Sequence, residues 1–274
     1  VDRCRNWGPY TTFGPLYVDY TPPPAATNVG SALSPGYWVG GDGLSSFGGY
    51  WNTVVDSESG LAGYGVEFDL NPSTIPSVVN ESASATSIAR LITVSGEYWE
   101  HVRPIDNAGN WGPTVHAGPY LYNVAPNSIY CTAKVNSLGC TPSISAINHG
   151  SIYYTTNFVV SASNVRNNKP GLLLYGMNGN VANPFQGGTL CIRAPIKRST
   201  PVNSGGSPSG NDCSGVYSID MSAFAHGLLG GTPSPELLQQ GTTVWCQWWG
   251  RDPGFQAPNN STLSNAMQYF VCYY

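Results

Sequence analysis

Charged residues are scarce in this sequence. Asp, Glu, Lys and Arg together make up 9% of the 274 residues, and the net charge is −4, whereas ordinary soluble domains contain about 25% charged residues. The 11 Lys and Arg residues are scattered, and the densest basic stretch is residues 192–199. Proteins that bind nucleic acid usually carry a longer track of basic residues than this stretch provides. We therefore expect no nucleic-acid partner.

Long apolar runs are also missing. No run reaches the roughly 18 residues that a membrane-spanning helix needs, so the sequence predicts no transmembrane segment. The first residues do not have the pattern of a signal peptide. If the protein is secreted, we expect this chain to be a mature product or a fragment of a longer one.

Motifs for catalysis are lacking too. The four histidines have no close metal-ligand spacing, and the cysteines form no CxxC pair. GxSxG and P-loop motifs are missing. The sequence thus predicts a protein that is not an enzyme and has no cofactor. Asp56 and Glu58 are a candidate pair of Ca²⁺ ligands, since Ca²⁺ prefers clustered oxygens; capping of their loop is the alternative.

The chain does have the composition of sheets and turns. Gly (33 residues) and Pro (22) are abundant, and aromatic residues make up 12%, which distinguishes the chain from disordered ones. Short runs rich in β-branched and aromatic residues alternate with turn-forming clusters, as in β-sandwiches. Residues 218–230 and 234–241 predict only short helical turns. The best strand candidates are residues 64–70, 89–95, 98–105, 118–124, 151–163, 171–177, 188–194, 242–249 and 267–274.

The sequence contains an internal repeat. Residues 1–23, VDRCRNWGPYTTFGPLYVDYTPP, align without a gap with residues 105–127, IDNAGNWGPTVHAGPYLYNVAPN. A repeat at this spacing indicates tandem modules. It predicts an opening segment at residues 1–23, a complete module at 24–127, and a remainder at 128–274 that holds most of the cysteines.

The complete module resembles the bacterial fibronectin type III or Ig-like repeat. The resemblance lies in residues 51–69, WNTVVDSESGLAGYGVEFD, residues 98–113, YWEHVRPIDNAGNWGP, and residues 118–126, GPYLYNVAP. It implies a β-sandwich in which the last two stretches are the penultimate strand with its turn and the closing strand. Glu100 departs from the pattern, because the strand period of two places it on the inward face with Tyr98.

By its likeness to residues 105–127, the opening segment is the turn and last strand of a preceding module. Two explanations are open. The chain is truncated inside that module, or the orphan strand adds to the sheet of a neighbouring subunit, because an unpaired strand offers its N–H and C=O groups to a sheet edge. Head-to-tail contacts of this kind do not close and yield a filament.

The remainder of the chain resembles an uncharacterised C-terminal domain of large secreted proteins from planctomycetes and related bacteria. The resemblance lies in residues 130–150, 168–198, 211–224 and 248–255. It implies an extracellular location and brings no established activity.

The cysteines indicate an oxidising compartment. Six of them are candidates for disulfides, and because six allow fifteen connectivities, the pairing is open. A local bridge between Cys131 and Cys140 is one alternative, since NSLG at residues 136–139 supplies a turn. Cys4 is the odd cysteine. Four alternatives are open for it: a free thiol, or a disulfide with a cysteine of this chain, of residues that precede this chain, or of another subunit. The six candidates are Cys131, Cys140, Cys191, Cys213, Cys246 and Cys272.

Aromatic side chains give a hint of a ligand. Alternation along VWCQWW puts Trp245 and Trp249 on one face of a strand, and Trp248 with Cys246 on the other. One face must be core, so Trp245 and Trp249, together with Tyr273, are candidates for stacking on glycans. Packing in the core is the alternative for each of them.

Three sequons mark candidate sites of N-glycosylation, at Asn80, Asn259 and Asn260. Glycans on these residues would compensate for the low charge by making the surface soluble.

Together these features predict an all-β fold of two β-sandwiches in tandem, Ig- or fibronectin type III-like and then disulfide-stapled, plus an orphan N-terminal strand. We expect a non-catalytic extracellular or cell-surface protein, either the end of an adhesin or a filament subunit that assembles by β-strand addition. Its partners are then copies of itself or other cell-surface proteins. The alternative is a carbohydrate-binding tail of a secreted hydrolase, with a polysaccharide as its ligand.

Overall fold

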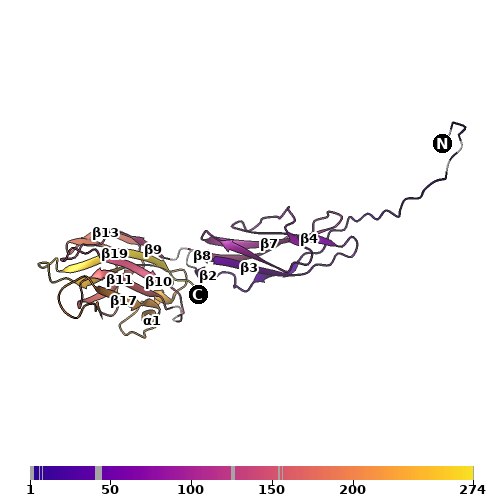
Figure 1. The fold of residues 1–274 in the computed structure, drawn as a ribbon. Coiled ribbons are helices and arrows are strands. Elements are labelled where there is room, and N and C mark those ends of the chain that lie inside the picture. Colours follow the sequence, from indigo (N-terminus) through magenta and orange to yellow (C-terminus); the bar gives the residue numbers. More distant parts are fainter. Residues whose placement is uncertain are drawn as a thin grey trace. The chain divides into compact units, whose positions relative to one another are not determined.

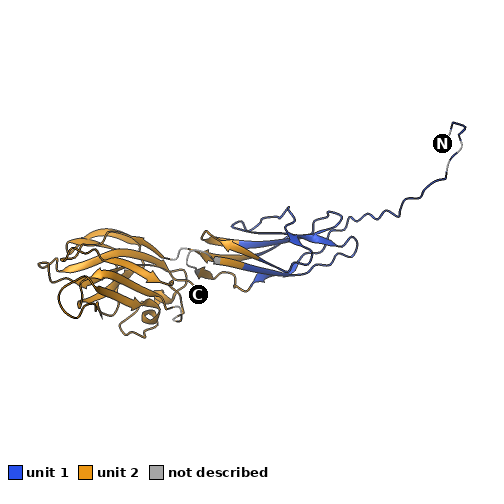
Figure 2. Ribbon diagram, viewed as in Figure 1, with its two compact units in different colours: residues 1–31, 48–88, 99–117 blue, residues 32–47, 89–98, 118–274 orange. Residues whose placement is uncertain are grey.

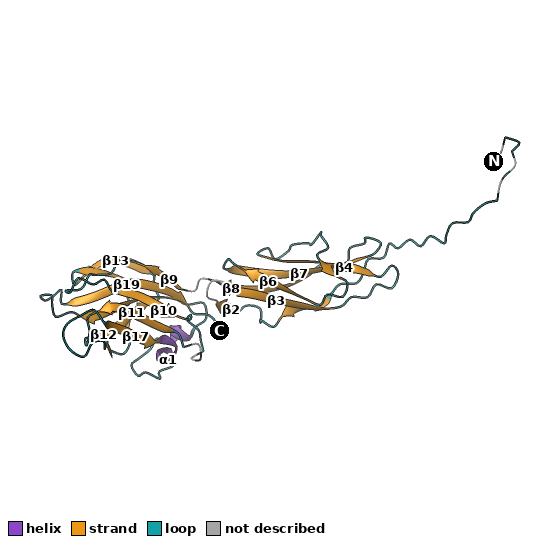
Figure 3. Cartoon of the chain, in the orientation of Figure 1, coloured by secondary structure: helices purple, strands orange, loops and turns teal. Residues whose placement is uncertain are grey.

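The structure of the chain is a computed structural model (Figure 1). The structure describes residues 3–5, 7, 9–40, 45–124, 127–153, 155 and 157–273. Six residues of the internal repeat lie outside these ranges: Val1, Asp2, Asn6, Gly8, Ala125 and Pro126. Strands account for 46% of the chain and helices for 4% (Figure 3). The predicted all-β class is therefore confirmed.

The described elements are mostly short strands. They are β1 (Thr27–Ser31), β2 (Trp38–Gly40), β3 (Ser45–Asn52), β4 (Leu61–Asp69), β5 (Glu81–Ser82), β6 (Ser87–Ile92), β7 (Gly96–Asp106), β8 (Val115–Asn123), β9 (Asn127–Tyr130), β10 (Ser143–Ile147), β11 (Val159–Val165), β12 (Pro170–Gly176), β13 (Asn180–Phe185), β14 (Gly188–Ile192), β15 (Lys197–Arg198), β16 (Val202–Asn203), β17 (Gly215–Asp220), β18 (Thr243–Arg251) and β19 (Ser261–Phe270).

The helical elements are α1 (Met221–Ala225) and the 3₁₀-helix η2 (Pro235–Leu238). They fall inside the two stretches for which short helical turns are predicted. No helix in the described part of the chain is long and apolar enough to cross a membrane. The strand predicted over residues 151–163 is shorter than expected, because β11 begins only at Val159.

The chain divides into two compact units (Figure 2). Unit 1 comprises residues 1–31, 48–88 and 99–117, and unit 2 comprises residues 32–47, 89–98 and 118–274. The domain boundaries inferred from the internal repeat stay a prediction.

Residues 27–123 form two sheets, in the orders β2-β8-β7-β4-β5 and β1-β3-β6. Strands β4 and β7 run antiparallel, with Val66 opposite Val102. Tyr64, Val66 and Val102 are buried, as the period of two requires. Glu100 is fully buried as well, which confirms its predicted inward position.

The opposite face of β4 and β7 is covered by Trp111. Gly65 lies opposite Arg103 in the register, and a Cβ on Gly65 would overlap Pro76 and the Val78 carbonyl oxygen and press against the Trp111 ring. The Arg103 guanidinium lies 5.0 Å from the centre of that ring, and its Nε donates to Gly112 O at 2.9 Å. Because position 65 has no side chain, the Trp111 ring can lie against the sheet and contact the Arg103 guanidinium.

The stretch DNAGNW forms the tight turn that the sequence predicts. Asp106 accepts from the backbone N–H of Asn110 at Oδ1 and from the Asn110 amide at Oδ2, both at 2.8 Å. Gly109 has a φ of +92°, which a side chain rarely allows. The Asp106 carboxylate is buried and is thus a fixed part of the turn.

Residues 127–272 form a second sandwich. A six-stranded sheet in the order β15-β12-β18-β19-β9, with β16 also beside β12, and a three-stranded sheet, β10-β11-β17, enclose one core. Cys246 and Trp248 of β18 point into this core, so Trp245 and Trp249 lie on the outer face of the larger sheet. This confirms the faces predicted from the VWCQWW stretch.

Tyr217 fills a gap in this core. Its ring stacks on Trp248 with ring centres 5.3 Å apart and planes at 17°. Gly171 and Gly250 pair across β12 and β18, and a Cβ on either would overlap the Tyr217 ring. Both positions must therefore lack a side chain for the ring to fit.

Two disulfides staple the second sandwich, Cys131–Cys191 and Cys140–Cys213. The alternative of a local Cys131–Cys140 bridge is therefore wrong. The first bridge joins residues that are 60 positions apart in the sequence, and the second joins residues that are 73 positions apart. Bridges that close long loops restrict the unfolded chain most.

Cys246 and Cys272 do not form the bridges for which they were candidates. Both are buried thiols, and burial raises the pKa of both, that of Cys272 to about 12. Because the thiolate is the reactive form, both act as inert core residues. Cys4 is exposed and belongs to neither disulfide, so its pairing with another subunit stays a prediction.

Candidate functional site

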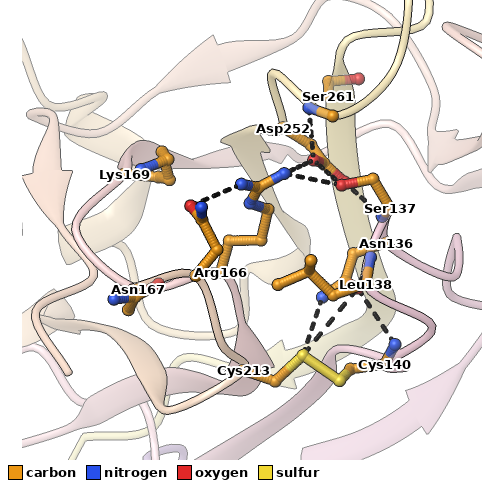
Figure 4. A network of polar contacts seen from close by, with 12 residues as sticks. Asn136, Ser137, Leu138, Cys140, Arg166, Asn167, Lys169, Cys213, Asp252 and Ser261 are labelled. Atoms are coloured by element: carbon orange, nitrogen blue, oxygen red, sulfur yellow. Dashed lines mark hydrogen bonds and ion pairs between the residues drawn. A yellow bond between two sulfur atoms is a disulfide. The ribbon is translucent and has the colours of Figure 1, made fainter. Parts of the chain in front are cut away.

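A network of buried charges joins distant loops of the second sandwich (Figure 4). Arg166 Nη1 lies 3.0 Å from Asp252 Oδ1, and both residues are buried. The Ser137 hydroxyl accepts from Arg166 at 2.7 Å and donates to Asp252 at 2.5 Å. Arg166 Nη2 donates to Asn211 Oδ1 at 2.8 Å. Four segments that are far apart in the sequence are thereby held together.

Asp252 is held in its charged form. Burial raises its pKa, but hydrogen bonds from Ser137, Arg166 and the backbone of Gly254 together outweigh burial, so the pKa is lowered. The backbone N–H of Ser137 adds a bond of 2.7 Å to Oδ2. The two Nη atoms of Arg166 and the Asp252 carboxylate bond to one another and to these loops, so we interpret the network as structural.

The network continues to the Cys140–Cys213 disulfide through Asn136 (Figure 4). Asn136 Oδ1 accepts from the N–H groups of Leu138 at 2.9 Å and Cys140 at 3.0 Å, and Nδ2 donates to Asn164 O at 3.3 Å. The buried amide thus fixes the loop at one end of the bridge.

A cavity of about 180 Å³ lies on the outer face of the six-stranded sheet. Leu172 pairs with Trp249 across β12 and β18, and Leu174 pairs with Arg198 across β12 and β15. Directly opposed residues point to the same face of a sheet, so three neighbouring strands form the floor. The tip of the β13–β14 hairpin completes the lining, which consists of Leu172, Leu174, Phe185, Gln186, Arg198 and Trp249.

The hairpin tip is a two-residue turn. Gln186 and Gly187 have φ values of +48° and +77°, between the paired residues Phe185 and Gly188. Two positive φ values match the twist of a hairpin. Trp249 Nε1 donates to Gln186 Oε1 at 2.9 Å, which ties the tip to the floor of the cavity.

Lys134 holds the same tip from another side. Its Nζ donates to the carbonyl oxygens of Gln186, Asn259 and Ser261 at 2.7, 2.6 and 2.7 Å. The ammonium also lies 4.5 Å from the centre of the Phe255 ring. All three of its N–H donors are used in this way, so Lys134 has a structural task.

Only one of the three predicted glycan-stacking residues lines the cavity, namely Trp249. Trp245 lies on the same face of β18, but Gln247 between the two is fully buried and bonds to the backbone of β14. Tyr273 packs against Tyr153, with ring centres 5.5 Å apart. The structure therefore does not bring the three together into one platform, because the hairpin crosses the sheet between the two tryptophans.

Three carboxylates gather in unit 1. Asp19, Asp56 and Asp106 place ligand atoms within 4.8 Å of one another. Oδ1 of Asp56 also caps its loop, since it accepts from the N–H groups of residues 58–60 at 3.2, 3.0 and 2.8 Å. The three carboxylates could hold a divalent cation such as Ca²⁺, which prefers several oxygens.

Glu58, the other predicted Ca²⁺ ligand, does not belong to this group. It accepts a hydrogen bond from Thr21 Oγ1 at 3.1 Å. Asp19 takes its place, with Oδ1 bonded to the N–H of Thr21 and Oδ2 to that of Ser59. Hydrogen bonds from Ser59 and Thr21 lower the pKa of Asp19. The predicted pair stays untested, and the trio that the structure brings together depends on a contact between Asp19 and the loop of Asp56, which is distant in the sequence.

Two histidines form a close pair in unit 1. His101 Nδ1 lies 2.6 Å from His116 Nδ1, and His101 Nε2 lies 3.5 Å from Asp69 Oδ1. His101 is fully buried and His116 is exposed. Burial lowers the pKa of His101, the carboxylate of Asp69 opposes this effect, and His116 adds to it. His101 is therefore neutral at pH 7.

The sequons differ in how well they could carry a glycan. Asn80 Oδ1 accepts from the N–H of Val66 and Nδ2 donates to Val66 O, both at 2.8 Å. A glycan on Nδ2 would break this contact with β4. Asn259 and Asn260 lie between β18 and β19, exposed and half-buried respectively. Glycosylation stays a prediction for all three asparagines.

Several residues of the cavity carry no functional signal in the sequence. The local sequence pattern indicates only loop or strand positions for Phe185, Gln186 and Arg198. The QGG stretch at residues 186–188 does have the composition of a hairpin turn, so the hairpin itself was predictable. Which sheet the hairpin covers depends on distant pairings that a local pattern does not contain.

No family model matches the chain, and no curated protein matches it. Among solved structures, it is similar to the FN1–FN3 domains of chicken CNTN1, with 11% identity and a TM-score of 0.28 over 92% of this chain and 67% of that one. It is similar to a tetra-tandem repeat in the extending region of a large adhesion protein, with 10% identity and a TM-score of 0.23 over 90% and 47%. A third is a 1.5-MDa bacterial ice-binding adhesin, with 12% identity and a TM-score of 0.24 over 90% and 64%. The chain thus spans less than two thirds of the last two structures.

Proposed function

We propose that the chain is a non-catalytic structural part of an extracellular surface protein, either the end of an adhesin or the subunit of a filament. Its N-terminal segment, residues 9–20, joins the sheet of another β-sandwich as an added strand. The two disulfides support a location in an oxidising space outside the cell.

The observation that carries this proposal is the exposure of the segment compared with its repeat. Tyr17 and Val18 are 91% and 64% exposed, whereas their counterparts in the repeat, Leu121 and Tyr122, are 9% and 1% exposed. These counterparts belong to β8, which lies between β2 and β7 in its sheet. Aligned positions of the repeat are therefore buried in the second copy and exposed to solvent in the first.

The segment is fixed to unit 1 at its C-terminal end. Asn110 Nδ2 donates to Asp19 O at 3.1 Å, and the N–H of Ser59 donates to Asp19 Oδ2 at 3.2 Å. Burial of each large apolar side chain contributes about 1.5–3 kcal/mol, and a strand edge adds backbone hydrogen bonds. The side chains available before the anchor, all largely exposed, are Trp7, Tyr10, Phe13, Leu16, Tyr17 and Val18.

Analytical ultracentrifugation and negative-stain microscopy of the full chain test this proposal. We expect assemblies that grow with protein concentration and that dissociate when a synthetic peptide of residues 9–23 is added in excess. Tyr17→Asp, which places a charge in the segment, should abolish assembly. Ile75→Asp is the matched control, because Ile75 is also an exposed apolar residue of unit 1 but lies outside the segment.

The filament form of the proposal is overturned if the chain sediments as a monomer at every concentration. It is also overturned if Tyr17→Asp assembles as the unchanged chain does, because the segment would then not be the joining element.

A further inference from the structure

The cavity at Trp249 combines an apolar floor with a polar rim. The floor consists of the Trp249 ring beside Leu172 and Leu174, on three neighbouring strands. The rim carries the amide of Gln186 and the guanidinium of Arg198. Binding sites commonly have this form, with apolar walls for contact and a few polar groups for orientation.

The cavity is formed before any ligand binds. Its roof is the two-residue turn at Gln186 and Gly187, held by Trp249 Nε1 and by Lys134 Nζ. Gln186 is a non-glycine residue with a positive φ, a conformation that persists only where surrounding contacts fix it. A fixed roof lowers the entropy that is lost on binding.

The charge around the cavity favours an anion. Arg198 is exposed, and its guanidinium has no ion-pair partner among the residues that the structure describes. Arg251 lies beside the cavity, 5.9 Å from the centre of the Trp249 ring. The lining contains no Asp or Glu, although acidic residues outnumber basic ones in the whole chain. A planar guanidinium without a partner suits a carboxylate.

The volume limits the ligand to about one ring. The cavity measures about 180 Å³, below the range of about 300–1,000 Å³ for sites of drug-sized ligands. A pyranose ring presents C–H groups to an aromatic face and hydroxyl groups to an amide such as that of Gln186. An acidic pyranose adds a carboxylate that Arg198 can pair with.

We infer that this cavity binds one uronic acid residue of an extracellular acidic polysaccharide. The Trp249 ring stacks on the sugar ring, and Arg198 pairs with the sugar carboxylate. Gln186 keeps its bond to Trp249 and offers its amide N–H groups to a sugar hydroxyl. This binding role is separate from strand addition by residues 9–20, and neither depends on the other.

Calorimetric titration of the full chain with trigalacturonate tests the inference, with the methyl ester of the same trisaccharide as the matched uncharged ligand. We expect binding of the acid, and binding of the ester that is weaker by about tenfold or more, as loss of a charge-assisted bond requires. The NMR signal of the Trp249 indole N–H should shift as the acid binds.

Arg198→Gln should weaken binding of the acid about tenfold or more without affecting the fold, because Arg198 is exposed. Arg193→Gln is the control, since Arg193 is exposed in the same sandwich and lies outside the lining. Near-ultraviolet circular dichroism verifies the fold of each variant. The inference is overturned if the acid does not bind, if acid and ester bind equally, or if both arginine variants bind like the unchanged chain.

Discussion

The ring of Tyr217 fills the space that the missing side chain of Gly250 leaves open. We therefore expect Gly250→Ala to lower the free energy of unfolding by about 1–3 kcal/mol, as overpacking of a core does. Urea denaturation measures the change. Gly48→Ala is the matched control, because it also lies in a strand and a Cβ there would meet nothing within 4 Å. Equal effects of the two substitutions would contradict the packing role of Gly250.

Removal of one charge from the buried pair Arg166–Asp252 should lower the free energy of unfolding more than removal of both charges does. Asp252→Asn leaves the Arg166 guanidinium buried without its counter-charge, which costs about 3–5 kcal/mol of unfolding free energy. The double variant Arg166→Met with Asp252→Leu should recover much of this loss. Chemical denaturation curves give the three values.

The exposed ion pair Lys197–Glu236 is the control for this prediction. Its nitrogen and oxygen are 3.7 Å apart and its side chains are 38% and 48% exposed, so Glu236→Gln should change stability by less than about 1 kcal/mol. A double variant that is less stable than Asp252→Asn would show that the charges themselves, and not their pairing, stabilise the loops.

The protein should lose stability as the pH falls below about 6.5. Burial lowers the pKa of His101 below its ordinary value of 6.5, so the unfolded chain binds a proton that the folded chain resists. Stability then decreases with falling pH, by at most about 1.4 kcal/mol for each unit by which the pKa is lowered. Urea unfolding at pH 7.5, 6.5 and 5.5 measures the decrease.

Two variants should shift the pKa of His101 in opposite directions. Asp69→Asn removes a charge that raises this pKa, and His116→Gln removes an electrostatic interaction that lowers it. NMR titration of the His101 ring protons reports both. A shift in the same direction for both would show that the pair at 2.6 Å does not control this titration.

Ca²⁺ should stabilise unit 1 through the carboxylates of Asp19, Asp56 and Asp106, whose ligand atoms lie within 4.8 Å of one another. At a concentration about 100 times its dissociation constant, the ion would add about 2.7 kcal/mol. Thermal unfolding with Ca²⁺ and with a chelator measures this. Asp56→Asn keeps the acceptor for the loop but removes the charge, and should abolish the effect.

Glu58→Gln is the control for the Ca²⁺ prediction, because Glu58 bonds to Thr21 and lies outside the carboxylate trio. It should respond to Ca²⁺ as the unchanged chain does. If Asp56→Asn and Glu58→Gln respond alike, the three carboxylates hold no cation.

Features that depend on short stretches could be predicted from the sequence. The period of two correctly placed Glu100 inward and separated Trp248 from Trp249. The turn at residues 106–111 followed from its Asp, Asn and Gly residues. Each of these is decided by neighbours within a few positions along one strand or turn.

Features that depend on distant contacts could not be predicted in this way. Cys131 and Cys140 are close in the sequence, yet each pairs with a cysteine 60 or more residues away. Trp245 and Trp249 share a face, but the β13–β14 hairpin covers the residue between them. Asp19 reaches Asp56 only because the chain folds back on itself. Local alternation carries no information on which of many distant partners is chosen.

The Cys131–Cys191 bridge has a consequence for the cavity at Trp249. Cys191 belongs to β14, one arm of the hairpin that forms the roof, and Cys131 follows the edge strand β9. The bond thus tethers the roof to the rim of the sheet below it. Where thiols are kept reduced, as in cytosol, this tether opens. The surroundings of the chain, and not its sequence alone, then decide whether the pocket keeps its shape.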